Sequence, residues 1–180
     1  MLNDLDRVLI DEDQIKSRVK DLATEIARDY GPDEEITVIS IINGAILFTA
    51  DLVRNLPGPV RIDCIRVSSY GDETSPVGEP KITSTLSLDL RGRHVLLVDD
   101  IFDTGNTISK VYKYLDEMQP TSIKTCVLLE KKARREVDFA IDWVGFQIPD
   151  EFVVGYGLDY AQRYRNLRCI GILKPELQPA

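Results

Sequence analysis

One segment near the middle of the chain constrains the fold more than any other. An apolar run at residues 94–98 leads directly into Asp99 and Asp100, and a third carboxylate, Asp103, follows shortly before a helical pattern starts at Thr104. Such a run is typical of a strand buried on both faces, as in a parallel sheet. Because open α/β sheets bind ligands at the carboxyl ends of their strands, the segment predicts a binding site there.

The remaining periodicities alternate between strand and helix. Strand patterns are predicted at residues 36–42, 60–67, 94–98 and 123–129, with shorter ones near 143–144, 152–155 and 169–173, and helical patterns at 11–30, 45–55 and 104–118. This alternation predicts an α/β fold with a mainly parallel core sheet flanked by helices. A length of 180 residues is typical of one domain, so we expect a single domain over residues 1–180.

Charge and cysteine usage exclude several classes of protein. The chain has 22 Lys and Arg against 30 Asp and Glu, so nucleic acid is not an expected partner of its surface. No apolar run approaches the roughly 18–20 residues needed to cross a bilayer, and the start of the chain is no signal peptide. Cys64, Cys126 and Cys169 lack metal-ligand spacing and favour buried free thiols, which indicates a cytoplasmic protein.

A long polar connection separates two of the predicted strands. Residues 68–80 contain two glycines, two prolines and several Ser or Thr. Loops of this length and composition are often lids over a binding site. A plain connection between strands is the alternative.

The residues after Asp100 predict a phosphate-binding loop. A helix start offers unpaired N–H groups and the positive end of the helix dipole, both of which suit an anion. Gly105 would let the backbone approach the phosphate closely, and Thr104 and Thr107 could add hydroxyl donors. Alternatively, Asp103 or Thr104 only caps the helix.

The acidic residues narrow the class of ligand. Asp99 and Asp100 could accept hydrogen bonds from sugar hydroxyls and help to hold magnesium. The segment has neither the GxxxxGK[ST] pattern of a nucleotide-hydrolysing loop nor the GxGxxG pattern of a dinucleotide site. A phosphorylated sugar therefore fits better than ATP or NAD.

These residues resemble a known family signature. The sequence VDDIFDTGNT at residues 98–107 is similar to the phosphoribosyl diphosphate (PRPP) motif of the type I phosphoribosyltransferases. Further pieces resemble the hypoxanthine-guanine phosphoribosyltransferase branch, at residues 42–45, 65–71, 128–132, 144–160 and 165–167. The resemblance implies the type I fold, a parallel core sheet with a small hood from the chain ends. It also implies purine salvage: transfer of the 5-phosphoribosyl group from PRPP to hypoxanthine or guanine, giving IMP or GMP and diphosphate.

The resemblance assigns roles around the purine. Asp103 would be the general base that takes the proton from the purine N7, and Lys131 would donate to the 6-oxo group. Phe152 would stack on the purine ring, with main-chain groups of Val153 reading its edge. From the residues alone, Lys131 could equally belong to a solvated run of charges, and Phe152 to a buried strand.

The resemblance also assigns ligands for PRPP and Mg²⁺. Asp99, Asp100 and Asp159 would bind the magnesium through oxygen atoms. The sugar and its 5′-phosphate would contact Asp99, Asp100, Asp103, Thr104, Gly105, Asn106 and Thr107.

Diphosphate would bind Asn43, Gly44 and Arg165, and Ser69 and Tyr70 would close over the site as a lid. Many members of the family carry Lys at the position of Asn43. Here the contact at this position would therefore rest on backbone N–H groups.

The family is usually dimeric or tetrameric, which implies a homodimer or homotetramer. Two other readings stay open: a PRPP-sensing regulator that binds RNA, and a non-catalytic subunit on the same fold. The net charge of −8 and the purine-type block at residues 144–160 disfavour the regulator. The joint presence of Asp99, Asp100, Asp103, Lys131 and Asp159 disfavours a subunit without activity. The preference among hypoxanthine, guanine and xanthine stays open.

Overall fold

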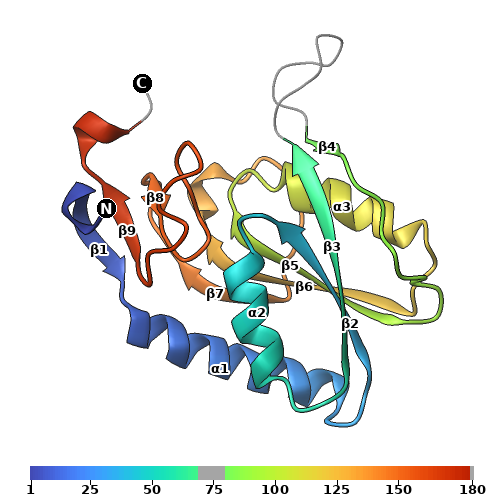
Figure 1. Cartoon of the computed structure of the whole chain (residues 1–180). Helices are drawn as coiled ribbons and strands as arrows, with labels where there is room; N and C mark the ends of the chain where they lie inside the picture. The colour runs from blue at the N-terminus through green and yellow to red at the C-terminus, as the bar shows by residue number, and fades with distance from the viewer. Residues whose placement is uncertain (69–79, 179–180) are drawn as a thin grey trace.

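The computed structural model describes residues 1–68 and 80–178. Its centre is a six-stranded sheet in the order β4-β3-β2-β5-β6-β7 (Figure 1). All neighbouring strands run parallel except β3 and β4, which are antiparallel. The strands are β2 (Ile36–Ile42), β3 (Val60–Ser68), β4 (Lys81–Ile82), β5 (His94–Phe102), β6 (Ser122–Glu130) and β7 (Trp143–Gln147).

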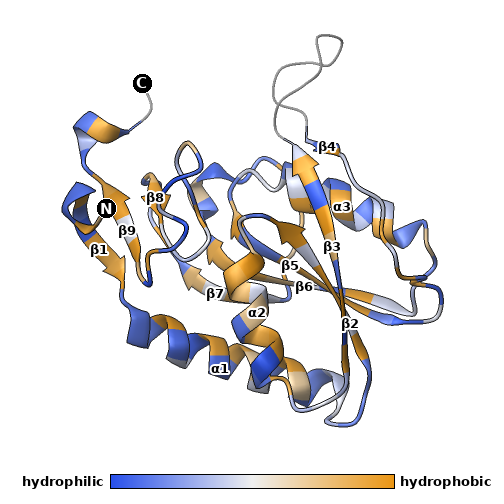
Figure 2. Cartoon of the chain, in the orientation of Figure 1, coloured by the Kyte–Doolittle hydropathy of each residue, from blue (hydrophilic) through white to orange (hydrophobic). Residues whose placement is uncertain are grey.

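Helices cover both faces of this sheet. The long helix α1 (Glu12–Tyr30) and the shorter α2 (Ile46–Asn55) pack on one face, and α3 (Asn106–Asp116) packs on the other. Side chains of β5 alternate between the two cores: Leu96 and Val98 face α1 and α2, whereas Leu97 faces α3. Figure 2 shows these strands as largely hydrophobic and α1 as divided into an apolar and a polar side. The predicted α/β class is confirmed.

The boundaries of α1 follow from its sequence. Asp11 accepts a hydrogen bond from the Gln14 N–H, and the Gln14 side chain accepts one from the Asp11 N–H, which forms a capping box. Gly31 follows the last turn with a φ of 102°, a conformation that favours glycine. The predicted helix at residues 11–30 is confirmed to within one residue.

A second, smaller sheet joins the two ends of the chain. It is antiparallel, in the order β1-β9-β8, with β1 (Leu5–Ile10), β8 (Val153–Val154) and β9 (Ile170–Leu173). Leu5 pairs with Leu173 across this sheet. This is the hood that the family resemblance implied, and Figure 1 shows it beside the end of the central sheet. The described residues also form three short 3₁₀ turns: η1 (Leu2–Asp4), η2 (Lys132–Arg134) and η3 (Pro175–Leu177).

Two further expectations concern membranes and thiols. Within the described ranges, no helix is both long and apolar enough to cross a membrane. Cys64, Cys126 and Cys169 are all free; Cys126 and Cys169 are buried and Cys64 is half-buried. Burial raises the pKa of all three thiols, which keeps them in the unreactive protonated form.

Candidate active site

A cavity of about 490 Å³ lies at the carboxyl ends of β2, β3 and β5, under the hood. Parallel pairing brings these strand ends to one edge of the sheet, as the sequence predicted. Residues far apart in the sequence therefore meet at its wall. The predicted residues that line it are Asn43, Gly44, Asp99, Asp100, Asp103, Thr104, Gly105, Thr107, Asp159 and Arg165.

The loop after β2 packs directly on an acidic residue of β5. A Cβ atom at Gly44 would overlap the carboxylate of Asp100, so only glycine fits there without displacing that side chain. The peptide bond between Ile42 and Asn43 just before it is cis. Gly44 thus fixes how closely the loop approaches the acidic strand.

Asp99 and Asp100 lie within β5 rather than after it. Pairing with β6 continues to the end of the strand, where Phe102 faces Glu130, so the predicted strand end at residue 98 was four residues short. Asp99 is only 5% exposed, and its Oδ1 accepts a hydrogen bond from the Asp100 N–H at 2.9 Å.

The electrostatics of this pair favour a cation. Burial raises the pKa of Asp99 well above its usual range, and the charge of Asp100 raises it further. Burial also raises the pKa of Asp100, although the charge of Arg165 opposes that shift. A buried carboxylate beside a half-buried one is stabilised when a positive ion shares their site.

The loop before α3 presents a helix start to the cavity. Gly105 occupies the N-cap position with a φ of 89°, and no side chain caps the helix. Asp103 is therefore not a helix cap, and that alternative is wrong. Thr104 only accepts a long bond of 3.4 Å from the Asn106 N–H. The Asn106 side chain does not line the cavity, because it donates to Glu136 at 2.9 Å.

Asp103 and Lys131 are linked by a chain of charges. Arg134 Nε lies 3.1 Å from Asp103 Oδ1, an ion pair without the alignment of a hydrogen bond. Arg134 also faces Asp150 at 3.7 Å, and Lys131 Nζ lies 3.5 Å from the same Asp150 oxygen. The Lys131 side chain is only 7% exposed, and the backbone N–H of Lys131 donates to the Phe102 carbonyl at 2.9 Å. The interpretation of Lys131 as a solvated charge is therefore wrong.

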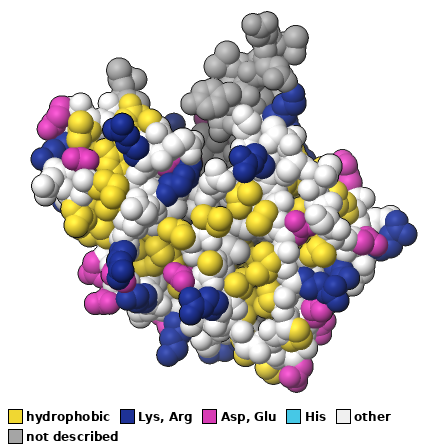
Figure 3. Space-filling model, viewed as in Figure 1, with side chains coloured by type: hydrophobic (Ala, Val, Ile, Leu, Met, Phe, Trp, Pro, Cys, Tyr) yellow, Lys and Arg dark blue, Asp and Glu magenta, His cyan; other side chains and the backbone are white. Residues whose placement is uncertain are grey.

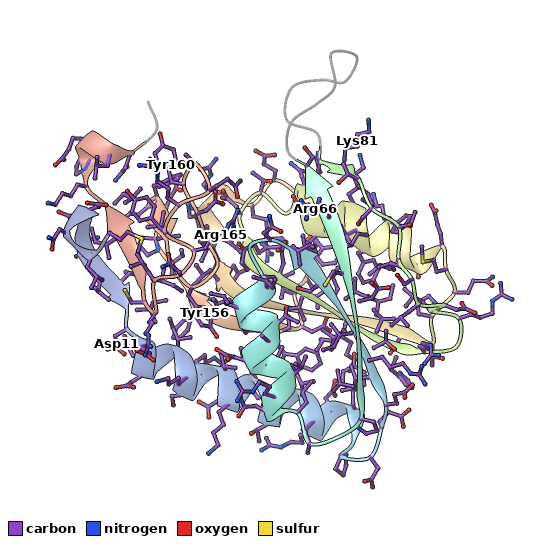
Figure 4. All side chains as sticks on the ribbon, viewed as in Figure 1. Asp11, Arg66, Lys81, Tyr156, Tyr160 and Arg165 are labelled. Carbon is purple, nitrogen blue, oxygen red and sulfur yellow. The ribbon has the colours of Figure 1, made fainter. Side chains whose placement is uncertain are left out.

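Asp159 and Arg165 form the hood side of the cavity. Arg165 pairs with Asp159 at 2.8 Å and donates to the Gly157 carbonyl at 2.7 Å and to Gln162 at 3.1 Å. Figure 4 shows Arg165 on the hood loops and Arg66 on β3. The described part of the chain gathers no three metal-ligating side chains in one group. Asp99, Asp100 and Asp159 thus share a cavity but not a preformed cage.

Some predicted residues lie elsewhere or outside the described ranges. Phe152 packs edge-on against Tyr160, with ring centroids 5.5 Å apart, and Val153 belongs to β8; neither lines the cavity. Ser69 and Tyr70 fall outside the described residues.

Besides several apolar residues, the cavity is lined by two polar residues to which the sequence reasoning gave no role, Arg66 and Gln162. Arg66 pairs with Ile42 in the neighbouring strand, a proximity that only the register of β2 and β3 reveals.

Comparisons with known proteins agree with this geometry. The family model described as "Phosphoribosyl transferase domain" matches residues 9–161. A hypoxanthine-guanine phosphoribosyltransferase of Aquifex aeolicus is 48% identical over 89% of this chain and 90% of its own length. A hypoxanthine phosphoribosyltransferase of Escherichia coli is 44% identical over 91% and 93%.

Among solved structures, a hypoxanthine phosphoribosyltransferase of Staphylococcus aureus superposes with a TM-score of 0.92. It is 38% identical, and the alignment covers 100% of this chain and 97% of that one.

Proposed function

Because the chain belongs to the phosphoribosyltransferase family, in its hypoxanthine-guanine branch, we propose that it is a purine salvage enzyme. It transfers the 5-phosphoribosyl group of PRPP to hypoxanthine or guanine and releases IMP or GMP together with diphosphate. The observation that carries this proposal is the cavity under the hood, where the acidic strand β5, the start of α3 and Arg165 converge. The wall formed by β5 and the start of α3 suits a sugar phosphate, and the wall that carries Arg165 suits a diphosphate.

The 5′-phosphate binds at the start of α3. Thr104, Gly105 and Thr107 line the cavity there, and the uncapped helix start offers N–H groups and the positive end of the dipole. Asn106 contributes through its backbone, since its side chain is engaged by Glu136. Asp99 and Asp100 remain to hold the ribose hydroxyls and a cation.

Asp103 serves as the general base for the purine. It lines the cavity beside the phosphate loop, and its carboxylate is 35% exposed, so an incoming ring can reach it. Lys131 donates to the 6-oxo oxygen, which an adenine amino group would not accept. Phe152 and Val153 cover the ring once it is bound. This arrangement holds the purine nitrogen in line with the sugar carbon.

Magnesium fits the acidic wall. The ion takes oxygen ligands, keeps several waters and is usually held by one or two carboxylates together with substrate phosphates. Buried Asp99 and half-buried Asp100 match that preference, and Asp159 lines the same cavity. When bound, magnesium neutralises charge on the diphosphate. Arg165 and the backbone N–H groups of Asn43 and Gly44 also bind the diphosphate.

The experiment is a panel of bases. The purified protein is incubated with PRPP, magnesium and hypoxanthine, guanine, xanthine or adenine, and diphosphate release is measured with and without a chelator. We expect product with hypoxanthine and guanine, almost none with adenine, and loss of activity on chelation that added magnesium restores. Efficient use of adenine, or full activity after chelation and dialysis, contradicts the proposal.

We also propose that the chain, as a single domain over residues 1–180, assembles as a homodimer or homotetramer in the cytoplasm. Apolar side chains gather over α2 on the face seen in Figure 3, where Ile46 is 49% and Leu47 is 37% exposed. Exposed apolar patches often mark surfaces of association. The three free thiols fit a reducing compartment. Sedimentation measurements test the assembly.

A further inference from the structure

The ionic chain beside the cavity involves two residues to which the proposed reaction assigns no role. Asp103, Arg134, Asp150 and Lys131 follow one another with separations of 3.1, 3.7 and 3.5 Å. Its two ends are the proposed base and the proposed purine donor. Its middle members come from η2 and from the turn before β8. Three separate loops are therefore connected by charge beside the cavity, where the proposed function requires the purine to bind.

Arg134 occupies the branching point of this chain. Its Nε faces Asp103 and its Nη1 faces Asp150, so one planar guanidinium spans two carboxylates. Among the residues that the structure describes, no other cation pairs with Asp103, and Asp103 Oδ1 has no hydrogen-bond partner. The orientation of the Asp103 carboxylate thus depends on Arg134.

Backbone hydrogen bonds fix the position of the main chain at Arg134. Its N–H donates to the Lys131 carbonyl at 3.2 Å, and Lys131 is tied to β5 through the Phe102 carbonyl at 2.9 Å. The neighbouring Arg135 is anchored on buried Glu130 at 2.9 Å. The Arg134 side chain is itself 48% exposed, so its substitution disturbs no core packing.

We propose that Arg134 is a positioning residue of the transfer reaction. It holds one oxygen of Asp103 so that the other faces the purine N7, and it binds Asp150, which pairs with Lys131. Arg134 thereby keeps Asp103 and Lys131 at relative positions from which both can contact the same purine ring. This inference rests on the proposed function and deepens it.

Two opposing effects follow from removing Arg134, and their sizes differ. A nearby cation weakens a carboxylate as a base, so its loss alone would favour proton transfer. That effect is small here, because Arg134 is half-exposed and water screens its charge. Misplacing a reacting group by about 1 Å can cost up to about 10²-fold in rate. Positioning therefore dominates, and turnover is expected to fall.

The test compares Arg134→Ala, Arg134→Lys and Lys132→Ala with the unmodified chain, using hypoxanthine, PRPP and magnesium. Lys132 is the matched control, since it lies in the same 3₁₀ turn, is exposed and carries the same charge. We expect Arg134→Ala to lower kcat about tenfold, with the KM for PRPP unchanged within twofold. Lys132→Ala should stay within twofold of the unmodified chain in both constants. Arg134→Lys should remain well below the unmodified chain, because one ammonium cannot span both carboxylates.

A second arm asks whether Arg134 acts through Asp103. In an Asp103→Asn background, adding Arg134→Ala should lower kcat by less than a further twofold, since the partner is already gone. Full additivity, an Arg134→Ala enzyme as active as Lys132→Ala, or complete rescue by Arg134→Lys would each overturn the inference and leave the proposed function intact. An unmodified enzyme that forms no nucleotide would overturn the function, and the inference with it.

Discussion

Asp103 is the residue whose chemistry a single-atom change alters most cleanly. Asp103→Asn keeps the shape of the side chain but removes its ability to accept a proton. We expect kcat to fall by roughly 10²–10⁴-fold, the range for a lost general base, while PRPP still binds. Steady-state diphosphate release with hypoxanthine measures this. A decrease of less than threefold would reduce Asp103 to a brace of the phosphate loop.

Under the proposed function, Lys131 determines the choice of purine because its ammonium group only donates hydrogen bonds. In Lys131→Ala, the 6-oxo oxygen of a bound purine loses its partner, and we expect kcat/KM for hypoxanthine to fall by about 10–100-fold. The KM for PRPP should be nearly unchanged, because Lys131 is not among the residues that line the cavity proposed to bind PRPP. Initial rates at varied hypoxanthine and varied PRPP separate the two effects. A loss confined to PRPP binding would contradict the assignment.

At the scale of elements, the site depends on how closely the loop after β2 approaches β5. In Gly44→Ala, the added methyl group would displace the Asp100 carboxylate. We therefore expect the KM for PRPP and the magnesium requirement to rise several-fold, because both depend on that wall of the cavity. Kinetics at varied PRPP and magnesium test this. Gly92→Ala is remote from the cavity lining, and no atom lies within 4 Å of its Cβ position, but its φ of 71° disfavours alanine. It therefore controls for a general loss of stability, and we expect it to leave both the KM for PRPP and the magnesium requirement unchanged.

The helices and strands of the core were largely predictable, because the spacing of apolar residues within each segment indicates its type. The apolar runs of β2 and β5 and the stripe of α1 are local signals. β1 was missed because its burial is confined to its two ends, Leu5 and Ile10, and its pairing partner lies far along the chain. The Asp99–Asp100 pair was predicted for the same local reason as the strand that carries it.

The ionic chain was not predictable from the sequence. Lys131 and Arg134 look like surface residues in a run of charges, and Asp150 lies in a distant turn. Only the packing of η2 against the end of β5 buries Lys131 and brings the three together. Burial and charge pairing of this kind depend on tertiary packing, which the local periodicity of a sequence does not reveal.

At the scale of the whole molecule, the hood has a small hydrophobic cluster of its own, beside the larger cores that stabilise the central sheet. Leu173 is fully buried in the small cluster of the hood, so Leu173→Ala should destabilise it by about 2–5 kcal/mol. We expect activity to be lost on heating at a lower temperature than the circular dichroism signal of the large sheet. Val8→Ala, at a half-exposed position of β1, is the matched control. Coincident loss of both signals would mean that hood and core unfold as one unit.

The pairing of β1 with β9 also has a consequence for synthesis on the ribosome. β1 is made before the other strands of the described chain, and its partner β9 is made after them. The parallel sheet can therefore form on the emerging chain while β1 still waits for its partner. Asp159 and Arg165 lie in the segment between β8 and β9, which the closing of that pair draws into place. A partly synthesised chain can thus have a folded sheet and its acidic strand end, whereas the proposed diphosphate site at Asp159 and Arg165 is completed only after β9 has been synthesised.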